Sequence, residues 1–175
     1  MLKKLLVLIL LSCMIFQLTA CFGPKKVYSD GRDTIKSWGD GSFQLLKGQK
    51  SNCLSFEKYN TILLNNVEEY IENNEHIYLY GLDNKGYTSN PQNYHVFVIL
   101  NIQTNKFKLC AETQDEKPYY FTYDDEIIAN GDGVIYSSLE MFSEEELSVF
   151  QSMKAAKPYL ENREQDREKD RGRFA

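Results

Sequence analysis

The run Tyr94 to Leu100 (YHVFVIL) constrains the fold more than any other part of this sequence. It is apolar at both odd and even positions, and the side chains of a strand alternate between the two faces of its sheet. A strand of this composition is therefore expected to be buried on both faces. Turn residues follow at Asn101–Asn105, and Lys106–Cys110 then alternates polar and apolar residues. This pattern predicts a hairpin at the centre of a sheet.

Weaker strand patterns lie on both sides of this hairpin. They are, in chain order, Ser42–Leu46, Cys53–Tyr59, His76–Leu82, Tyr119–Tyr123 and Gly133–Tyr136. The apolar run Thr61–Val67 fits either a strand or the start of a helix, and the apolar residues at 67, 70 and 71 have helical spacing. A turn at Asp83–Gly86 precedes the central hairpin. This order of short strands predicts a mainly antiparallel β-sheet.

The clearest helix of the sequence begins at Ser143. Ser143 and Glu146 have the spacing of a capping box, in which each side chain accepts a hydrogen bond from the backbone N–H of the other residue. Leu147, Phe150 and Met153 form an apolar stripe that can dock on a sheet. The fold class is therefore predicted to be α+β, a mainly antiparallel β-sheet with a C-terminal helix packed on one face.

Composition divides the chain into four parts. We expect a leader at 1–20, a tether at 21–37, a globular α+β domain at 38–157 and a charged tail at 158–175. A chain of 175 residues with 42 % hydrophobic residues supports one domain of modest size. The tail begins at Pro158 and has little apolar surface to bury, which predicts disorder or a solvated helix.

The leader has the features of an export signal. Lys3 and Lys4 precede an uncharged run from Leu5 to Ala20, which is typical of a secretory signal peptide. The run is shorter than the roughly 20 apolar residues that a membrane-spanning helix needs. Its end, Leu18-Thr19-Ala20-Cys21, resembles the lipobox of bacterial lipoprotein precursors.

This resemblance implies a lipid anchor. In that family a diacylglycerol is attached to the cysteine sulfur, and a peptidase then cuts just before the cysteine, whose new amino group is acylated. It implies cleavage between Ala20 and Cys21, fatty acids such as palmitate on Cys21, and attachment to the extracytoplasmic side of a bacterial membrane. Phe22 permits transfer to the outer membrane where the envelope has two membranes. The alternatives are an ordinary secretory leader, with Cys21 a bystander, and a single-pass anchor.

The net charge bears on the partners. Lys and Arg number 20 and Asp and Glu 25, which gives a formal charge of −5. Proteins that bind nucleic acid usually carry a basic surface, so we do not expect this acidic protein to bind nucleic acid. An acidic body gains nothing from anionic lipid head groups. We therefore expect the anchor to hold the protein at the membrane, where an envelope protein is the expected partner.

Two cysteines remain after Cys13 and Cys21 are assigned to the leader and the lipid. Export would place Cys53 and Cys110 in an oxidising compartment. The strand phase puts both side chains opposite the apolar face, on the same side of the sheet. A disulfide between them would stabilise the fold by about 4 kcal/mol in the chain-entropy model. The alternative is two thiols too far apart to bond, since the two Cα atoms must lie within about 7 Å.

Sequence motifs for catalysis, for metal binding and for nucleotide binding are absent. The sequence has no HExxH, paired CxxC, EF-hand loop, phosphate-binding glycine loop or GxSxG. His76 and His95 start strands, and a Cys/His pair with Cys53 or Cys110 has no support in the spacing. The acidic segments 123–126 and 130–133 could bind calcium weakly, but surface turns are the simpler interpretation. We therefore predict no enzyme, no cofactor and no metal site.

Aromatic residues make up 13 % of the chain and suggest a binding surface. Tyr78 and Tyr80 share one face of the predicted strand His76–Leu82, and exposed tyrosines could grip a sugar or a protein partner. The favoured alternative is a second layer of core that the C-terminal helix covers.

Three functions follow from the sequence. The leading prediction is a non-enzymatic envelope lipoprotein with a binding or structural role. The second is an inhibitor or immunity lipoprotein against an exported toxin or lytic enzyme, and the third is a hydrolase with an unrecognised site. A pocket with converging histidine and carboxylate groups would favour the enzyme, a tyrosine face would favour binding, and an acidic edge would favour inhibition of a basic partner.

Overall fold

The computed structural model describes residues 33–83, 94–112 and 125–173. Their strands are β1 Asp33–Trp38, β2 Phe43–Lys47, β3 Asn52–Phe56, β4 Thr61–Glu72, β5 His76–Asp83, β6 Tyr94–Asn101, β7 Lys106–Glu112 and β8 Gly133–Tyr136. The helices are η1 Glu57–Tyr59, α2 Asp125–Ala129, η2 Leu139–Met141, α3 Glu144–Ser152 and α4 Lys157–Arg173. The leader, the lipobox, most of the predicted tether and the strand predicted at Tyr119–Tyr123 lie outside the described residues.

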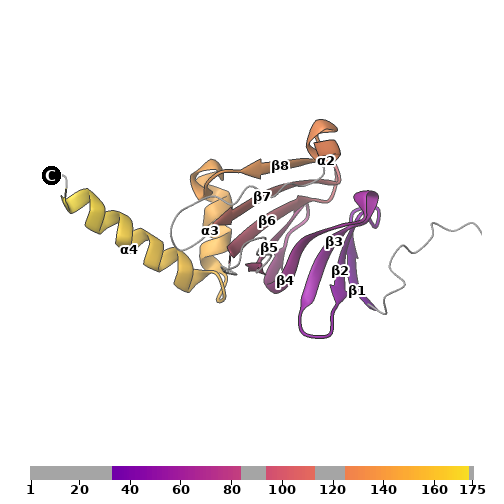
Figure 1. The fold of residues 1–175 in the computed structure, drawn as a ribbon, viewed down its shortest axis with the longest axis horizontal. Helices are drawn as coiled ribbons and strands as arrows, with labels where there is room; N and C mark the ends of the chain where they lie inside the picture. The colour runs from indigo at the N-terminus through magenta and orange to yellow at the C-terminus, as the bar shows by residue number, and fades with distance from the viewer. Residues whose placement is uncertain (1–32, 84–93, 113–124, 174–175) are drawn as a thin grey trace, which may run out of the picture. The chain divides into compact units, whose positions relative to one another are not determined.

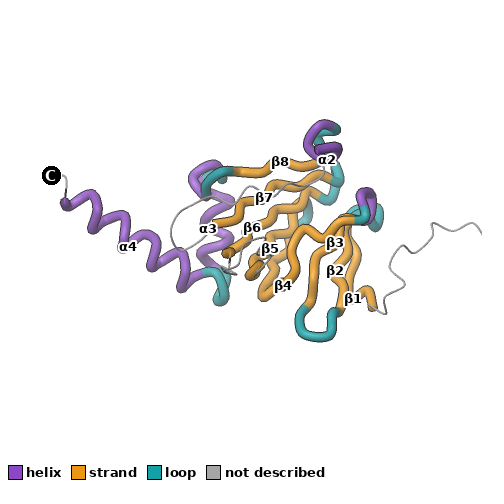
Figure 2. Tube along the Cα trace, viewed as in Figure 1, coloured by secondary structure: helices purple, strands orange, loops and turns teal. Residues whose placement is uncertain are grey.

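The strands form one sheet in the order of the chain, from β1 to β8 (Figure 1). Every neighbouring pair is antiparallel except β7 and β8, which are parallel. Three helices, η2, α3 and α4, follow the last strand (Figure 2), whereas η1 follows β3 and α2 precedes β8. The predicted α+β class, with a mainly antiparallel sheet and C-terminal helical structure on one face, is confirmed.

Strand β4 is the corner of the sheet. Its first half pairs with β3 and its second half with β5, and Val67 is the residue that pairs on both sides. The register shifts beside Val67 in both pairings, which bends the strand so that it passes from one layer to another. At Gly81 a Cβ would lie 1.9 Å from the carbonyl oxygen of Asn66, so only glycine fits beside the bend. We call β1–β3 the first layer and β5–β8 the second.

The inner core lies between these two layers. It is formed by apolar side chains from β1 to β7 and by Ile127 of α2. The ring of Phe56 on β3 meets the ring of Phe107 on β7 edge-on, with centroids 5.8 Å apart. At the edge, Lys58 donates to Asp132 at 2.6 Å, and the Tyr59 hydroxyl also donates to Asp132. Contacts between residues so far apart in sequence hold the two layers together.

A second core lies on the other face of β5, β6 and β7. Phe97 and Ile99 contribute to it from β6, whereas Val96, Val98 and Leu100 of the same strand belong to the inner core. The prediction that this strand is buried on both faces is confirmed. Residues of η2, α3 and α4 and of the segments that join them cover the second core, namely Leu139, Phe142, Phe150, Met153, Ala156 and Leu160.

Helix α3 begins as the sequence predicts. The Glu146 N–H donates to the Ser143 hydroxyl at 3.2 Å, and the Ser143 N–H donates to the Glu146 carboxylate at 2.9 Å. The other oxygen of Glu146 accepts a hydrogen bond from Lys108 of β7 at 2.6 Å, which ties the helix to the sheet. Phe150 and Met153 are fully buried, as the apolar stripe predicts.

The folded domain begins earlier in the chain than the predicted start at residue 38. The predicted tether includes Asp33–Ser37, but these residues are part of β1, which pairs with β2 and buries Trp38. Ile35 is bulged out of the pairing, which hides the alternation expected of a strand.

The helical spacing at 67, 70 and 71 was also misleading, because β4 continues to Glu72 and its backbone pairs with β5.

The charged tail is helical where the structure describes it. Helix α4 begins at Lys157, so Pro158 lies in its first turn, where a missing N–H costs no hydrogen bond. Leu160 is 8 % exposed and belongs to the second core. The predicted disorder of this segment is therefore wrong for its first turns.

No helix in the described ranges combines the length and the apolar character that crossing a bilayer requires.

Candidate functional site

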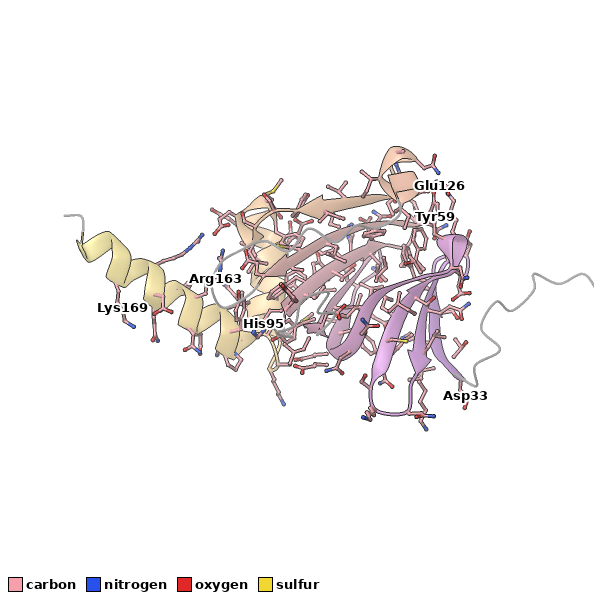
Figure 3. All side chains as sticks on the ribbon, in the orientation of Figure 1. Asp33, Tyr59, His95, Glu126, Arg163 and Lys169 are labelled. Atoms are coloured by element: carbon pink, nitrogen blue, oxygen red, sulfur yellow. The ribbon has the colours of Figure 1, made fainter. Side chains whose placement is uncertain are left out.

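A cavity of about 520 Å³ lies between the second layer and helix α4. Tyr80 and His95 line it from β5 and β6. The opposite wall comes from the segment leading into α4 and from the helix itself, and includes Tyr159, Arg163 and Lys169. Figure 3 shows His95 at the sheet end of α4, with Arg163 and Lys169 further along the helix. We call this space the α4 cavity.

His95 lies between two tyrosines. Its Nδ1 is 2.7 Å from the Tyr80 hydroxyl, and its ring stacks on Tyr159 with centroids 3.8 Å apart and planes 15° apart. Burial lowers the pKa of His95 to about 4, so the ring is neutral at pH 7. With the ring proton on Nε2, Nδ1 accepts a hydrogen bond from the Tyr80 hydroxyl.

The tyrosines remain protonated for the same physical reason. Burial raises the pKa of Tyr80 and of Tyr159 above the ordinary value for a phenol, because the phenolate would lose its hydration. Glu112 adds to the effect on Tyr159 through charge repulsion. The cavity wall thus offers hydroxyl groups and a neutral imidazole at physiological pH.

Glu112 at the end of β7 holds this wall in place. The residue is 3 % exposed, and its carboxylate forms an ion pair with Arg163, with 2.9 Å between Nε and Oε2. The same carboxylate accepts hydrogen bonds from the Leu139 N–H at 2.9 Å and from the Tyr159 hydroxyl at 3.2 Å. Arg163 also pairs with Glu140 at 2.9 Å. One buried carboxylate therefore fastens η2 and α4 to the sheet.

The buried ionisable groups of the wall are engaged with one another. A base with a pKa of about 4 is weak at neutral pH, and Tyr80, not a carboxylate, occupies His95 Nδ1. Glu112 is occupied by its donors from η2 and α4. The described residues of the cavity wall include none of the hydroxyl or thiol nucleophiles Ser, Thr and Cys. What the wall provides is ring stacking and hydrogen bonding.

The predicted tyrosine face is not a surface. Tyr78 is 5 % exposed and Tyr80 2 %, because both belong to the second core under α3 and α4. Tyr78 packs edge-on against Phe150, with centroids 5.6 Å apart. The exposed binding face is therefore wrong, and the alternative of a helix-covered second core is what the structure has. Of these two tyrosines, Tyr80 lines the α4 cavity and Tyr78 does not.

The predicted Cys53–Cys110 disulfide is also wrong, because the two cysteines are not bonded to each other. The strand phase was correct in placing Cys110 away from the inner core. However, the bend in β4 brings β3 and β7 face to face across the inner core, where Phe56 meets Phe107. Cys110 points to the other face of β7, into the second core, so its thiol is directed away from the layer that contains Cys53.

The histidines and acidic segments do not form a joint site. Each histidine lies at the start of its strand, and β5 and β6 are antiparallel, with His76 opposite Asn101 and His95 opposite Leu82. The two histidines therefore lie at opposite ends of this strand pair. His76 lies at a separate hollow beside α3, where Asn101 Nδ2 is 3.2 Å from its Nε2. Burial raises the pKa of Cys110, which makes it a poor nucleophile for a Cys/His pair.

Asp132 belongs to the second acidic segment, and its carboxylate accepts hydrogen bonds from Lys58 and Tyr59. Within the described ranges, His, Cys, Asp and Glu side chains form no cluster of three or more suited to a metal ion.

Sequence reasoning missed Glu112, Tyr159 and Arg163. The available signal was weak: an acidic residue ending an apolar strand, and an apolar pair, Tyr159-Leu160, with Arg163 on the next turn of the charged segment. Comparison with models of protein families, with curated proteins and with solved structures finds no match to this chain.

Proposed function

We propose that this protein is a lipid-anchored bacterial envelope protein whose domain binds a small ligand in the α4 cavity, without catalysis. The observation that carries the location is the sequence Leu18-Thr19-Ala20-Cys21 at the end of a basic and apolar leader. The binding role is supported by the cavity, whose volume of about 520 Å³ lies in the usual range of ligand sites. Its buried ion pair and stacked rings give it rigid walls.

Radioactive palmitate labelling tests the anchor, and the leader supplies a matched control. We expect the wild type and Cys13→Ala to incorporate label and to fractionate with membranes. Cys21→Ala is expected to lose the label and to keep its leader, because the lipid-dependent peptidase cannot process it. Equal labelling of Cys21→Ala and the wild type would refute the lipoprotein assignment.

Substitution of a residue in the cavity wall tests the binding role. Tyr159→Ala removes the ring that stacks on His95, so the variant should lose affinity for any ligand of the cavity. Lys154→Ala, at an exposed site that does not line the cavity, is the control. A ligand isolated with the wild type and equally with Tyr159→Ala would place binding elsewhere.

The second candidate, an inhibitor of a basic toxin or lytic enzyme, is favoured by the acidic surface beside α3. Glu75, Glu144 and Glu145 are exposed there. Lysozyme serves as a basic probe: inhibition that weakens with salt and is lost in Glu75→Lys/Glu145→Lys would support this candidate. The same variant with unchanged inhibition would exclude this surface.

A further inference from the structure

We propose that the α4 cavity takes a neutral, hydroxyl-rich saccharide. This inference rests on the proposed function and specifies its ligand. The first reason is the charge of the walls. Arg163 is already paired with Glu112 and Glu140, and Asp166 lies 3.2 Å from Lys169. An anion that bound Arg163 would have to displace the buried carboxylate of Glu112, whereas a neutral ligand leaves that ion pair intact.

The second reason is the aromatic part of the wall. The rings of His95 and Tyr159 stack on each other, and both residues line the cavity. The faces of a pyranose ring present C–H groups, which pack on aromatic rings, while its hydroxyls point outward in the ring plane. Tyrosine and histidine combine an apolar body with a polar tip, so they can serve both parts of a sugar.

The third reason is the hydrogen-bonding stripe of α4. Asn162, Gln165 and Asp166 line the cavity and are exposed, and their spacing of three and four residues puts them on one side of the helix. An amide both donates and accepts hydrogen bonds, and a carboxylate only accepts them. Sugar hydroxyls do both, so such a ligand can satisfy all three side chains at once. A purely apolar ligand would leave them without partners.

Titration calorimetry on the mature lipoprotein in detergent micelles tests the inference. The probes are maltotriose and the N-acetylglucosamine trimer as neutral saccharides, and citrate as an anion of small size. We expect at least one trisaccharide to bind and citrate not to bind. Asn162→Ala and Asp166→Ala should each weaken saccharide binding about tenfold, the loss expected for one good hydrogen bond. Glu164→Gln, on the same helix but outside the cavity wall, should bind as the wild type does.

Three results would overturn the inference. Citrate binding in the absence of saccharide binding would show an anion site. Saccharide binding that is unchanged in both Asn162→Ala and Asp166→Ala would place the sugar outside this cavity. Absence of binding to all three probes would also refute the saccharide assignment. None of these results affects the lipid anchor, which palmitate labelling tests separately, and citrate binding lost in Tyr159→Ala would keep the cavity as a binding site.

Discussion

The Glu112 carboxylate and the Arg163 guanidinium form an ion pair, 2.9 Å between Oε2 and Nε, that joins the last residue of β7 to helix α4. The side chains are 4 % and 13 % exposed, so both charges have lost most of their hydration. Such a pair contributes little when it replaces apolar packing, but breaking it leaves a buried charge without its partner. The attachment of α4 therefore depends on both residues being present.

Arg163→Ala should lower the free energy of unfolding by about 3–5 kcal/mol, because Glu112 would keep its burial and lose its counter-charge. Urea unfolding followed by circular dichroism measures the change. Arg167→Ala is the matched control: Arg167 is more exposed and pairs with exposed Glu140, so its loss should cost less than about 1 kcal/mol. Similar losses in the two variants would contradict the role of the buried pair.

Truncation of the C-terminus should show a sharp dependence on position. Removal of 159–175 deletes Leu160 of the second core and Arg163, so we expect a loss of about 3 kcal/mol or more. Removal of 168–175 leaves these residues in place and should change the melting temperature little. The measurement is differential scanning calorimetry of the three chains. An unchanged melting temperature for the longer deletion would mean that α4 does not stabilise the domain.

The neutral state of His95 predicts a loss of stability in mild acid. Its pKa falls from 6.5 to about 4 on folding, so the unfolded chain binds the proton more readily between these values. The contribution of His95 to stability is then present above pH 6.5 and is lost progressively as the pH falls toward 4. The ring is partly exposed, so we expect about 1–2 kcal/mol after allowance for solvent screening.

His95→Asn isolates this effect, since its amide can replace Nδ1 as an acceptor for Tyr80 but does not titrate. The free energy of unfolding, measured from pH 7.5 to 4, should fall more steeply for the wild type than for the variant. Parallel curves would show that His95 has the same affinity for protons in both states.

The bend in β4 should be sensitive to one methyl group. Gly81→Ala would place a Cβ 1.9 Å from the Asn66 carbonyl oxygen, and moving two paired strands apart should cost about 2–3 kcal/mol. Gly131→Ala is the control: the new Cβ meets no atom within 4 Å, and only the positive φ of 67° opposes it, at about 1 kcal/mol. Urea unfolding of both variants compares the costs. A Gly81→Ala protein as stable as Gly131→Ala would mean that β4 can straighten.

Burial of Cys110 predicts its resistance to alkylation. The residue has no exposed surface, and burial raises the pKa of its thiol, so the reactive thiolate is scarce. Iodoacetamide should modify Cys110 in urea but not in the native protein, as measured by peptide mass mapping. The same maps should contain no peptide that joins Cys53 to Cys110. Detection of that peptide in the native protein would refute the placement of Cys110 in the second core.

Local sequence signals predicted the elements whose structure depends on near neighbours. The capping box at Ser143 and Glu146 needs only one turn of helix, and the burial of Tyr94–Leu100 on both faces follows from the composition of one strand. The sequence could not reveal that β4 bends at Val67, because the bend depends on pairing with both β3 and β5. The disulfide prediction failed for the same reason: side-chain phase is local, whereas the packing of β3 against the face of β7 opposite Cys110 is not.

The candidate site was beyond reach for a related reason. Glu112 and Arg163 are 51 positions apart in the chain, and each has the sequence surroundings of a solvated charge. Only the docking of α4 by Leu160 brings them together and buries them. The composition of 158–175 predicts a solvated segment. Its first turns are nevertheless attached to the domain by buried Leu160 and by the ion pair of Arg163.

Dependence of the second core on α4 has a consequence for biogenesis. Under the proposed export the chain would cross the membrane with its N-terminus first, so β5, β6 and β7 would emerge before Leu160 and Arg163. During that interval the outer aromatic face of the sheet has no cover from α4, and it offers chaperones and proteases a target. Maturation of the domain would thereby await the arrival of α4, and a translocation product truncated before this helix would be a target for degradation.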